Sequence, residues 1–281
     1  MSALPEFTRP FDWEQIDAAT LDIGGCILKG LLTKAELLAL NQEVDDYLDN
    51  SPKYGQPETG SAQYNQFLGH NTIRLHGLVE KFPSAAELVG HKEITSWATR
   101  ILAPKADSIL LNAGELIQIN PGEPRQATHR DTDSWPIALE ADPIIVNAIV
   151  AFDDFTEENG ATAIAPASWS WDTDRRPNSD EYVRAIMQRG DAVLFRGDLI
   201  HGGGANHSGS PRRAISLSYC AGWLRTVENN YLNVSRATLA MLTPHLQSLL
   251  GYDVHDGSSL NAGMVGLYEN GDPRRFVDEL L

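Results

Sequence analysis

Residues 190–203 read GDAVLFRGDLIHGG, an apolar run that is bounded by glycines and contains one histidine near its end. The run is short, rich in β-branched and aromatic residues and flanked by Gly and Asp, which is typical of a buried β-strand. His201 lies at the end of this predicted strand and is followed by three glycines. Glycines remove side chains and let the backbone approach a neighbouring group closely. We therefore expect a strand whose last side chain faces an open space.

Three further runs have the same texture. They are SILLNAGELIQI at 108–119, PIIVNAIVAF at 143–152 and RAISLSYCAGWL at 213–224. Several short strands that are joined by loops, with no helices alternating between them, favour an antiparallel sandwich or barrel. The sequence thus predicts a mainly β fold with flanking helices.

Helical patterns lie on both sides of this β region. Residues 33–48, TKAELLALNQEVDDYL, open with Thr33 and Glu36 in capping-box spacing and continue with an apolar stripe at helical spacing. A second helical region is expected at about 84–102, whereas the polar residues 50–70 predict a loop. We expect one domain over 1–281, with N-terminal helices at about 33–102, a β core at about 108–224 and a C-terminal helical segment at about 232–281.

The stretch THRDTDSW at 128–135 places one imidazole and two carboxylates at alternate positions. In an extended segment the side chains at i, i+2 and i+4 emerge on one face, so His129, Asp131 and Asp133 could converge on one metal ion. A His near an Asp in a loop is, however, more often a surface hydrogen-bonding pair. A metal site therefore needs a further ligand from another part of the chain.

His201 is the strongest candidate for that ligand. The other histidines lie in helical patterns or polar loops, where a structural role is the simpler account. His129, Asp131 and His201 supply two imidazoles and one carboxylate, the facial triad that suits Fe(II) and leaves coordination positions free. A structural zinc site would be closed by four ligands, often including Cys, and none is evident. We interpret the three residues as a catalytic metal site, from which Asp133 is left out.

Arg212 comes eleven residues after His201, at the start of another predicted strand. A guanidinium at this place could bind a carboxylate through two hydrogen bonds, as an organic diacid cosubstrate would require. Arg213 is adjacent but would point to the opposite face of an extended segment. Without His201 upstream, a solvated strand end would be the preferred account of either arginine.

The composition of the chain argues against several classes of binding partner. The 38 acidic and 22 basic residues give a formal net charge of -16, which disfavours nucleic acid or an anionic membrane surface as the main partner. Cys26 and Cys220 cannot form a disulfide framework. No stretch approaches the roughly 18 apolar residues of a membrane helix, and the N-terminus lacks the pattern of a signal peptide. We expect a cytoplasmic protein that acts on a small molecule.

With these motifs the sequence resembles the phytanoyl-CoA dioxygenase (PhyH) family of Fe(II)- and 2-oxoglutarate-dependent oxygenases, in particular members acting on specialised metabolites. The similarity covers roughly residues 108–224. It is carried by HRD at 129–131, ENGATAIAPASW at 158–169, GDLIHGGGANHSG at 197–209 and RRAIS at 212–216. An HxD, a later His and an Arg eleven residues beyond it are a fairly specific combination. The resemblance implies a double-stranded β-helix (jelly-roll, cupin-like) core.

The resemblance also implies roles for individual residues. His129, Asp131 and His201 would bind iron, and Arg212 would bind the distal carboxylate of 2-oxoglutarate. Asp131 keeps the carboxylate whose place is taken by a small residue in related halogenases, so halogenation is disfavoured. Further residues that would help to hold 2-oxoglutarate are Thr162, Gln126 and Arg74.

The implied reaction consumes O2 and 2-oxoglutarate, releases succinate and CO2, and oxidises the substrate by hydroxylation, desaturation or ring rearrangement. Because no Lys/Arg cluster is visible for the phosphates of an acyl-CoA, we favour an apolar small molecule such as a terpenoid, alkaloid or polyketide-type metabolite. The residues considered for substrate contact, each also a candidate for core packing, are Trp135, Phe67, Leu75, Trp223 and Tyr231.

Several alternatives stay open from the sequence. The chain could hydroxylate an acyl-CoA, as the name-giving members of the family do. It could be a metal-dependent barrel enzyme that needs no 2-oxoglutarate, or a barrel that only binds a ligand. The segment from about Asn229 could also cover the pocket of a neighbouring subunit, so a homodimer is considered.

Overall fold

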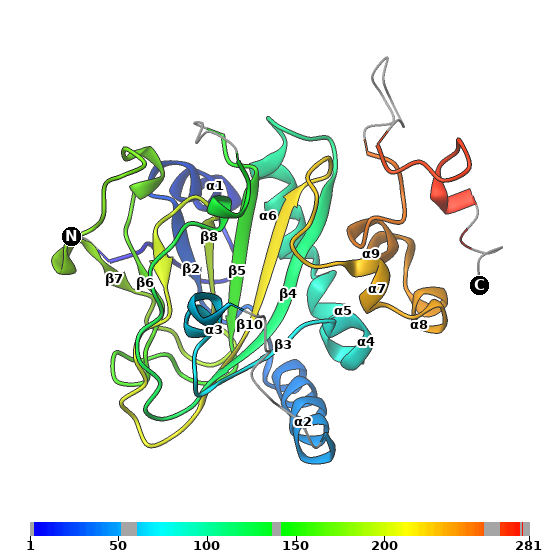
Figure 1. Cartoon of the computed structure of the whole chain (residues 1–281). Helices are drawn as coiled ribbons and strands as arrows, with labels where there is room; N and C mark the ends of the chain where they lie inside the picture. The colour runs from blue at the N-terminus through cyan, green and yellow to red at the C-terminus, as the bar shows by residue number, and fades with distance from the viewer. Residues whose placement is uncertain (1–2, 52–60, 137–141, 256–264, 276, 278–281) are drawn as a thin grey trace.

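Two β-sheets form the centre of the protein (Figure 1). The computed structural model describes residues 3–51, 61–136, 142–255, 265–275 and 277. Within this part of the chain, a seven-stranded sheet has the order β1-β2-β8-β5-β10-β4-β3 and a three-stranded sheet the order β7-β6-β9. Neighbouring strands run antiparallel, except that β1 and β2 are parallel.

The strands confirm most of the predicted β runs. The large sheet contains β1 (Glu6–Phe7), β2 (Gly25–Leu28), β3 (Thr72–Leu75), β4 (Ile109–Ile119), β5 (Ile145–Ala151), β8 (Ala192–Arg196) and β10 (Arg212–Ala221). The small sheet contains β6 (Ala163–Ile164), β7 (Val183–Arg184) and β9 (His201–Gly202). The prediction of a single strand over residues 190–203 is wrong. The chain turns after Arg196, so the residues before the turn belong to the large sheet and those after it to the small sheet. His201 therefore begins β9 and does not end the preceding strand.

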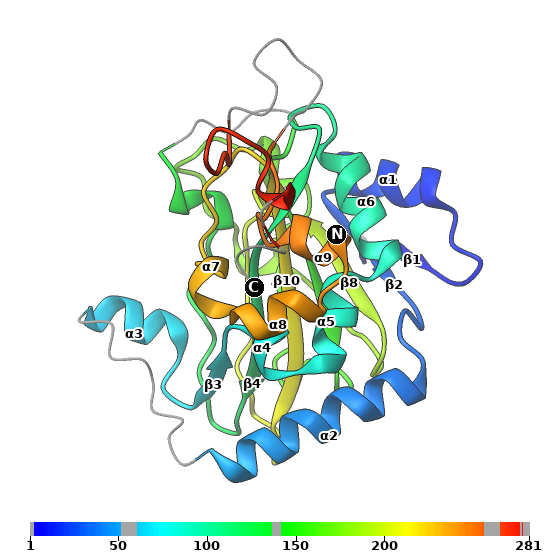
Figure 2. The same ribbon diagram turned by 90° about the vertical axis from the view of Figure 1, so that its right-hand side faces the viewer.

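Helices flank the large sheet. They are α1 (Trp13–Asp22), α2 (Lys34–Asn50), α3 (Ala62–Leu68), α4 (Leu78–Lys81), α5 (Pro83–Val89), α6 (Lys92–Leu102), α7 (Asn230–Asn233), α8 (Arg236–Met241) and α9 (Pro244–Leu249). Helices α1, α4, α6 and α9 pack against the outer face of the large sheet, whereas α3 lies apart from them (Figure 2). The predicted capping box is present, since Thr33 Oγ1 accepts from the Glu36 backbone N–H and the Glu36 carboxylate accepts from Thr33 N. Among the described residues, no helix is long and apolar enough to cross a membrane.

The helical part departs from the prediction in three places. The region 84–102 is two helices, because His91 has non-helical backbone angles and starts α6 as its N-cap. Residues 62–68, expected in a loop, form α3, while 52–60 lie outside the described residues. The C-terminal segment is a series of short helices, in which Leu239 is buried but Met241 is 80% exposed.

Strand β10 shows how the sheet separates two environments. Ile215, Leu217 and Tyr219 face the helices and belong to the main hydrophobic core. The alternate residues Ser216 and Ser218 face the other way, toward a cavity between the sheets. A second core cluster, which includes Phe155, Ile164 and Phe195, fills the rest of the space between the sheets. The expected β core with flanking helices is thus confirmed, although the large sheet is open and the helices are more extensive than predicted.

Candidate active site

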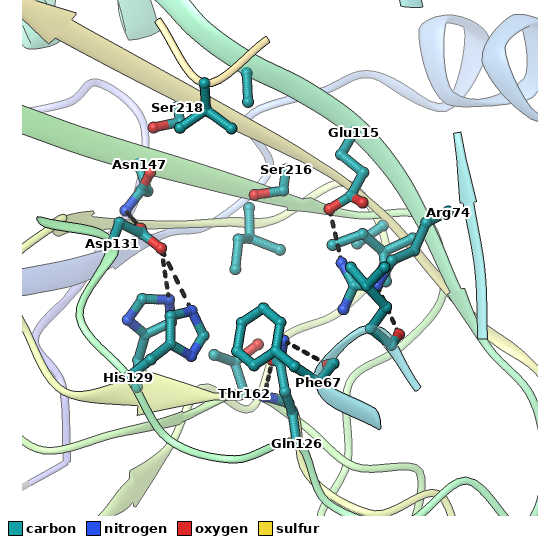
Figure 3. A pocket seen from close by; sticks show the side chains of 18 of the residues that line it. Phe67, Arg74, Glu115, Gln126, His129, Asp131, Asn147, Thr162, Ser216 and Ser218 are labelled. Carbon is teal, nitrogen blue, oxygen red and sulfur yellow. Dashed lines mark hydrogen bonds and ion pairs between the residues drawn. The ribbon is translucent and has the colours of Figure 1, made fainter. Parts of the chain in front are cut away.

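A cavity of about 250 Å³ lies between the two sheets and collects most of the predicted site (Figure 3). Strands β4, β5, β8 and β10 supply its floor, and β9 supplies His201. The predicted site residues that line it are His129, Asp131, His201, Arg212, Thr162, Gln126, Arg74 and Phe67. Residues separated by more than 130 positions in the sequence therefore meet at one site.

Two imidazoles and a carboxylate converge at one end of the cavity. One potential ligand atom from each of His129, Asp131 and His201 lies within 4.8 Å of the other two. Asp131 Oδ1 is 3.4 Å from His129 Nε2 and 3.8 Å from His201 Nε2. Such a donor set with few ligands suits a metal ion that keeps open coordination positions.

The two imidazoles are oriented by backbone carbonyls. His129 Nδ1 lies 3.2 Å from Ala127 O, and His201 Nδ1 lies 3.0 Å from Leu199 O. A carbonyl can only accept a hydrogen bond, so Nδ1 carries the proton in both rings and Nε2 keeps the lone pair for a metal. Burial also lowers the pKa of His201, which favours the neutral, metal-binding form.

The backbones of the two histidines hold each other. His129 N donates to His201 O and His201 N donates to His129 O, each over 3.0 Å, in an isolated antiparallel bridge. Asp131 then begins a 3-10 turn, Asp131–Ser134, so the extended segment expected through Asp133 is wrong. Asp133 is exposed and accepts from Arg130 N over 3.3 Å. The carboxylate of Asp133 is thus used in the turn and is not part of the cluster.

Arg130 points away from the triad, as its place between His129 and Asp131 predicts. Its guanidinium is buried and donates to Asp198 O over 3.0 Å and to Ser168 O over 2.8 Å. Asp198 lies in the turn that leads to His201. The side chain of Arg130 therefore links the segment that carries His129 and Asp131 to the segment that carries His201.

Asp131 is held as a charged group. Burial by itself would raise the pKa of Asp131, but the imidazoles of His201 and His129 and the amide of Asn147 stabilise its negative charge, and the pKa of the carboxyl is lowered. Asn147 Nδ2 donates to Asp131 Oδ2 over 2.6 Å. An ionised carboxylate is the form that binds a metal.

Arg212 is a buried cation that forms no ion pair within the part of the chain that the structure describes. Its Nη1 donates to Gly160 O over 2.5 Å and its guanidinium lies 4.2 Å from the centre of the Phe155 ring. Its Nε has no hydrogen-bond partner among the described residues. Burial, with repulsion from Arg74, lowers the pKa of Arg212 to about 9. An anion bound in the cavity would relieve this unfavourable burial. Arg213 points to the opposite face, as predicted, and there it forms an ion pair with Asp45.

The other residues considered for 2-oxoglutarate have partners of different kinds. Arg74 Nη1 forms a 2.7 Å ion pair with Glu115, on the cavity wall opposite the triad (Figure 3). Gln126 Oε1 accepts from Gly203 N over 3.1 Å. Thr162 is buried and lines the cavity.

From the sequence, the glycines after His201 are expected to permit a close backbone approach and to leave space beside the histidine. At Gly204, a Cβ atom would lie 2.8 Å from Gly160 Cα, so this glycine permits a close approach of two backbones. Gly203 lines the cavity, but Gly202 and Gly204 do not. The close approach is thus found at Gly204, and only Gly203 of the three borders the cavity.

The five residues considered for substrate contact are distributed over different surroundings. Phe67 lines the cavity, with its ring 4.7 Å from that of His129. Trp223 and Tyr231 line a second cavity of about 580 Å³, which shares Val227 with the first. Leu75 packs against the hydrophobic core, and the Trp135 indole N–H donates to Arg225 O. Only Phe67 of the five thus lies beside the triad.

Several polar cavity residues were missed by the sequence reasoning. Asn112 occupies a β-bulge in β4, where it bonds Ser218 and the backbone of Val227. Asn147 interrupts the apolar strand β5. Glu115 lies in the middle of β4. The available signal was the same in each case, a polar residue inside an otherwise apolar strand, because such a side chain requires a buried partner.

The donor set of two imidazoles and one carboxylate is the one that non-haem iron oxygenases use. The family model described as Phytanoyl-CoA dioxygenase (PhyH) matches residues 22–214, so the chain belongs to the phytanoyl-CoA dioxygenase family.

Individual relatives agree with this membership. "Dioxygenase trt7" of Aspergillus terreus is 37% identical over 238 residues, which cover 82% of this chain and 80% of the relative. "Dioxygenase aneA" of Aspergillus aculeatus is 31% identical over 255 residues, covering 88% and 83%. A solved structure, that of the epimerase SnoN in complex with Fe3+, alpha ketoglutarate and nogalamycin RO, is similar in fold, with a TM-score of 0.60. It shares 20% sequence identity and covers 75% of this chain and 84% of its own.

These findings confirm the predicted class of enzyme. The chain is an Fe(II)- and 2-oxoglutarate-dependent dioxygenase, as the family, the dioxygenase relatives and the cluster of three potential metal ligands together indicate.

Proposed function

We propose that the protein uses Fe(II), 2-oxoglutarate and O2 to oxidise a small molecule of specialised metabolism. The observation that carries this proposal is the pairing of two features in one cavity. Three potential metal-ligand atoms lie within 4.8 Å of one another, and the buried guanidinium of Arg212, whose Nε has no hydrogen-bond partner among the described ranges of the chain, lines the same cavity.

His129 Nε2, Asp131 Oδ1 and His201 Nε2 are the proposed iron ligands. The donor set fits the ion, because both imidazoles keep an unprotonated Nε2 and the carboxylate is ionised. When bound, Fe(II) with 2-oxoglutarate and O2 supplies the oxidising power for an unactivated C–H bond.

The protein's own residues position the reactants. We assign the distal carboxylate of 2-oxoglutarate to Arg212, with Thr162 and Gln126, which line the same cavity, as further contacts. Arg74 adds positive potential near Arg212 while it remains paired with Glu115. The rings of Phe67 and Phe195 pack against the two imidazoles and shield that end of the cavity from water.

We propose as substrate the small apolar molecule that the sequence favours, such as a terpenoid, alkaloid or polyketide-type metabolite. We add that this molecule carries hydrogen-bonding groups. Glu115, Ser216 and Ser218 line the cavity, so a substrate that also carries hydrogen-bonding groups fits better than a pure hydrocarbon. An acyl-CoA fits less well, since Arg74 is already paired with Glu115 and the guanidinium of Arg130 is engaged by two backbone carbonyls. Activity assays with metabolite panels of these classes would test the preference.

We further propose that the two sheets form a double-stranded β-helix within a single domain over 1–281, and that the protein is cytoplasmic. Exposed apolar side chains gather after β10, and they include Val227, Tyr231, Leu232 and Met241. A second copy of the chain is the proposed cover of this surface, and sedimentation velocity would reveal a monomer if that is wrong.

An anaerobic titration tests the central proposal. Fe(II) and 2-oxoglutarate are added to the metal-free protein, and absorbance in the metal-to-ligand charge-transfer region is followed. We expect a band with the wild-type protein. Arg212→Ala should weaken 2-oxoglutarate binding by about 2–5 kcal/mol, or roughly 30-fold or more, because a buried charge pair is lost.

Arg213→Ala is the matched control. Arg213 is adjacent in sequence but faces Asp45 on the other side of the sheet, so 2-oxoglutarate binding should remain at the wild-type value. Absence of the band in the wild-type protein would refute the proposal, and equal effects of the two substitutions would refute the role of Arg212.

A further inference from the structure

Asn147 is a buried polar residue in the middle of an apolar strand. Its neighbours Val146 and Ala148 face the helix-side core, whereas Asn147 lines the cavity. Asn147 has an exposed fraction of 2%. A buried amide destabilises the fold unless it is hydrogen-bonded, so its partner indicates its purpose.

The partner is Asp131, whose two oxygens have different neighbours. Oδ2 accepts a 2.6 Å hydrogen bond from Asn147 Nδ2. Oδ1 faces the two imidazoles, at 3.4 Å from His129 Nε2 and 3.8 Å from His201 Nε2. Figure 3 shows Asp131 between Asn147 on one side and His129 on the other. The carboxylate cannot rotate without losing this short hydrogen bond.

Asp131 needs such a support more than the histidines do. The histidine backbones form a reciprocal bridge, whereas Asp131 stands at the start of a 3-10 turn. Its backbone N–H donates to Gly197 O over 2.8 Å, which places the main chain but leaves the carboxylate free to turn. Asn147, by contrast, is fixed by the strand pairs that join β5 to β8 and β10.

We propose that Asn147 is a positioning residue for the metal, which holds Asp131 Oδ2 so that Oδ1 alone points toward the ion. Binding through a single carboxylate oxygen keeps other coordination positions free for 2-oxoglutarate and O2. This inference rests on the proposed function, since it presupposes that the three residues bind a metal. Hydrogen bonds to metal ligands of this kind typically change metal affinity by about 10- to 100-fold.

Asn147→Ala tests the proposal, with Ser218→Ala as its matched control. Ser218 pairs with Asn147 in the ladder between β10 and β5 and lines the same cavity. Its hydroxyl, however, accepts a hydrogen bond from Asn112 and makes no bond to Asp131 among the described contacts. Metal-free protein is titrated with Co(II), and the visible absorption of the bound ion reports affinity and coordination geometry. We expect Asn147→Ala to bind Co(II) about 10- to 100-fold more weakly, with a changed spectrum. Ser218→Ala should have the Co(II) affinity and the Co(II) spectrum of the wild-type protein.

Two more variants keep the test decisive if Asn147→Ala does not fold. Asn147→Ser keeps a hydroxyl donor, and Asn147→Leu keeps the bulk without a donor. Co(II) affinity should fall in the order wild-type, Ser, Leu. Equal affinities of the Ser and Leu variants and the wild-type protein would overturn the role of Asn147. Failure of the wild-type protein to bind Co(II) would instead overturn the proposed function itself.

Discussion

The two sides of the cavity are built by different means. On one side, the ligand turns, residues 127–134 and 197–201, carry the proposed metal ligands. On the other, the strand floor, formed by β4, β5, β8 and β10, carries Arg212 and the polar side chains. Arg212 is placed by ladder pairing, opposite Ile119 of β4. The ligand turns have only short pairings, namely the bridge between His129 and His201 and the short pair of β9 with β6, and they depend in addition on side chains such as Arg130 and Asn147. Long strand ladders fix one half of the site, whereas short pairings and individual side-chain hydrogen bonds fix the other.

Removing a ligand from the turns should have the largest effect. His201→Ala deletes one of three proposed ligands, and we expect metal affinity to fall by more than the roughly 10- to 100-fold typical of a supporting residue. Co(II) titration measures this loss. His207→Ala is the control, because His207 is exposed in the following loop. Wild-type affinity in His201→Ala would mean that the turns do not hold the metal.

Breaking the tie between the two turns should have an intermediate effect. Arg130→Ala leaves two buried carbonyls, Asp198 O and Ser168 O, without their donor. We expect a loss of about 2–3 kcal/mol in the free energy of unfolding, together with weaker metal binding. Urea denaturation of the metal-free protein measures the first quantity.

A surface arginine provides the comparison for Arg130. Arg175 forms an exposed 2.6 Å ion pair with Glu181, so Arg175→Ala should cost less than about 1 kcal/mol. Similar losses in the two variants would contradict the idea that the turns depend on buried side-chain bonds.

The smallest effect is expected on the floor side, at His76. Its Nδ1 lies 3.7 Å from Glu228 and its Nε2 3.4 Å from Glu115, with Arg74 nearby. Interaction with Glu228 raises the pKa of His76, although burial and Arg74 oppose this. The stabilisation is therefore complete below about pH 6.5 and is lost as the pH rises through the raised pKa.

Unfolding free energies measured across this pH window should show the decline. The effect is small because the side chain of His76 is half-exposed. His76→Gln should remove the pH-dependent part, and an unchanged pH profile in that variant would rule out His76 as its source.

The sequence was most informative where chemistry leaves few choices. Two imidazoles, a carboxylate and a downstream arginine were found from residue type and spacing, and the structure brings all four together. The reasoning about local geometry was weaker. Asp131 reaches the site from a 3-10 turn, because Gly197 O holds its N–H in place of a strand partner. That bond joins residues far apart in the sequence, so no local pattern predicts it.

Contacts that depend on register were also beyond the sequence. Asn147 could be recognised as polar within an apolar strand, but its meeting with Asp131 depends on how β5 is aligned under the turn. Leu75 and Trp135 looked like pocket residues because they lie near motifs in the sequence. Their neighbours are instead the hydrophobic core and Arg225 O.

The bridge between His129 and His201 has a consequence for the evolution of such enzymes. Because each backbone donates to the other over 3.0 Å, the spacing of the two imidazoles is set locally and not by the chain that connects them. The connecting chain still carries Asp131, Asn147 and strands of both sheets, so the positions that can change in length without altering the spacing of the two imidazoles are its loops. Lengthening or shortening such a loop would change the surroundings of the cavity and leave the distance between the two imidazoles in place.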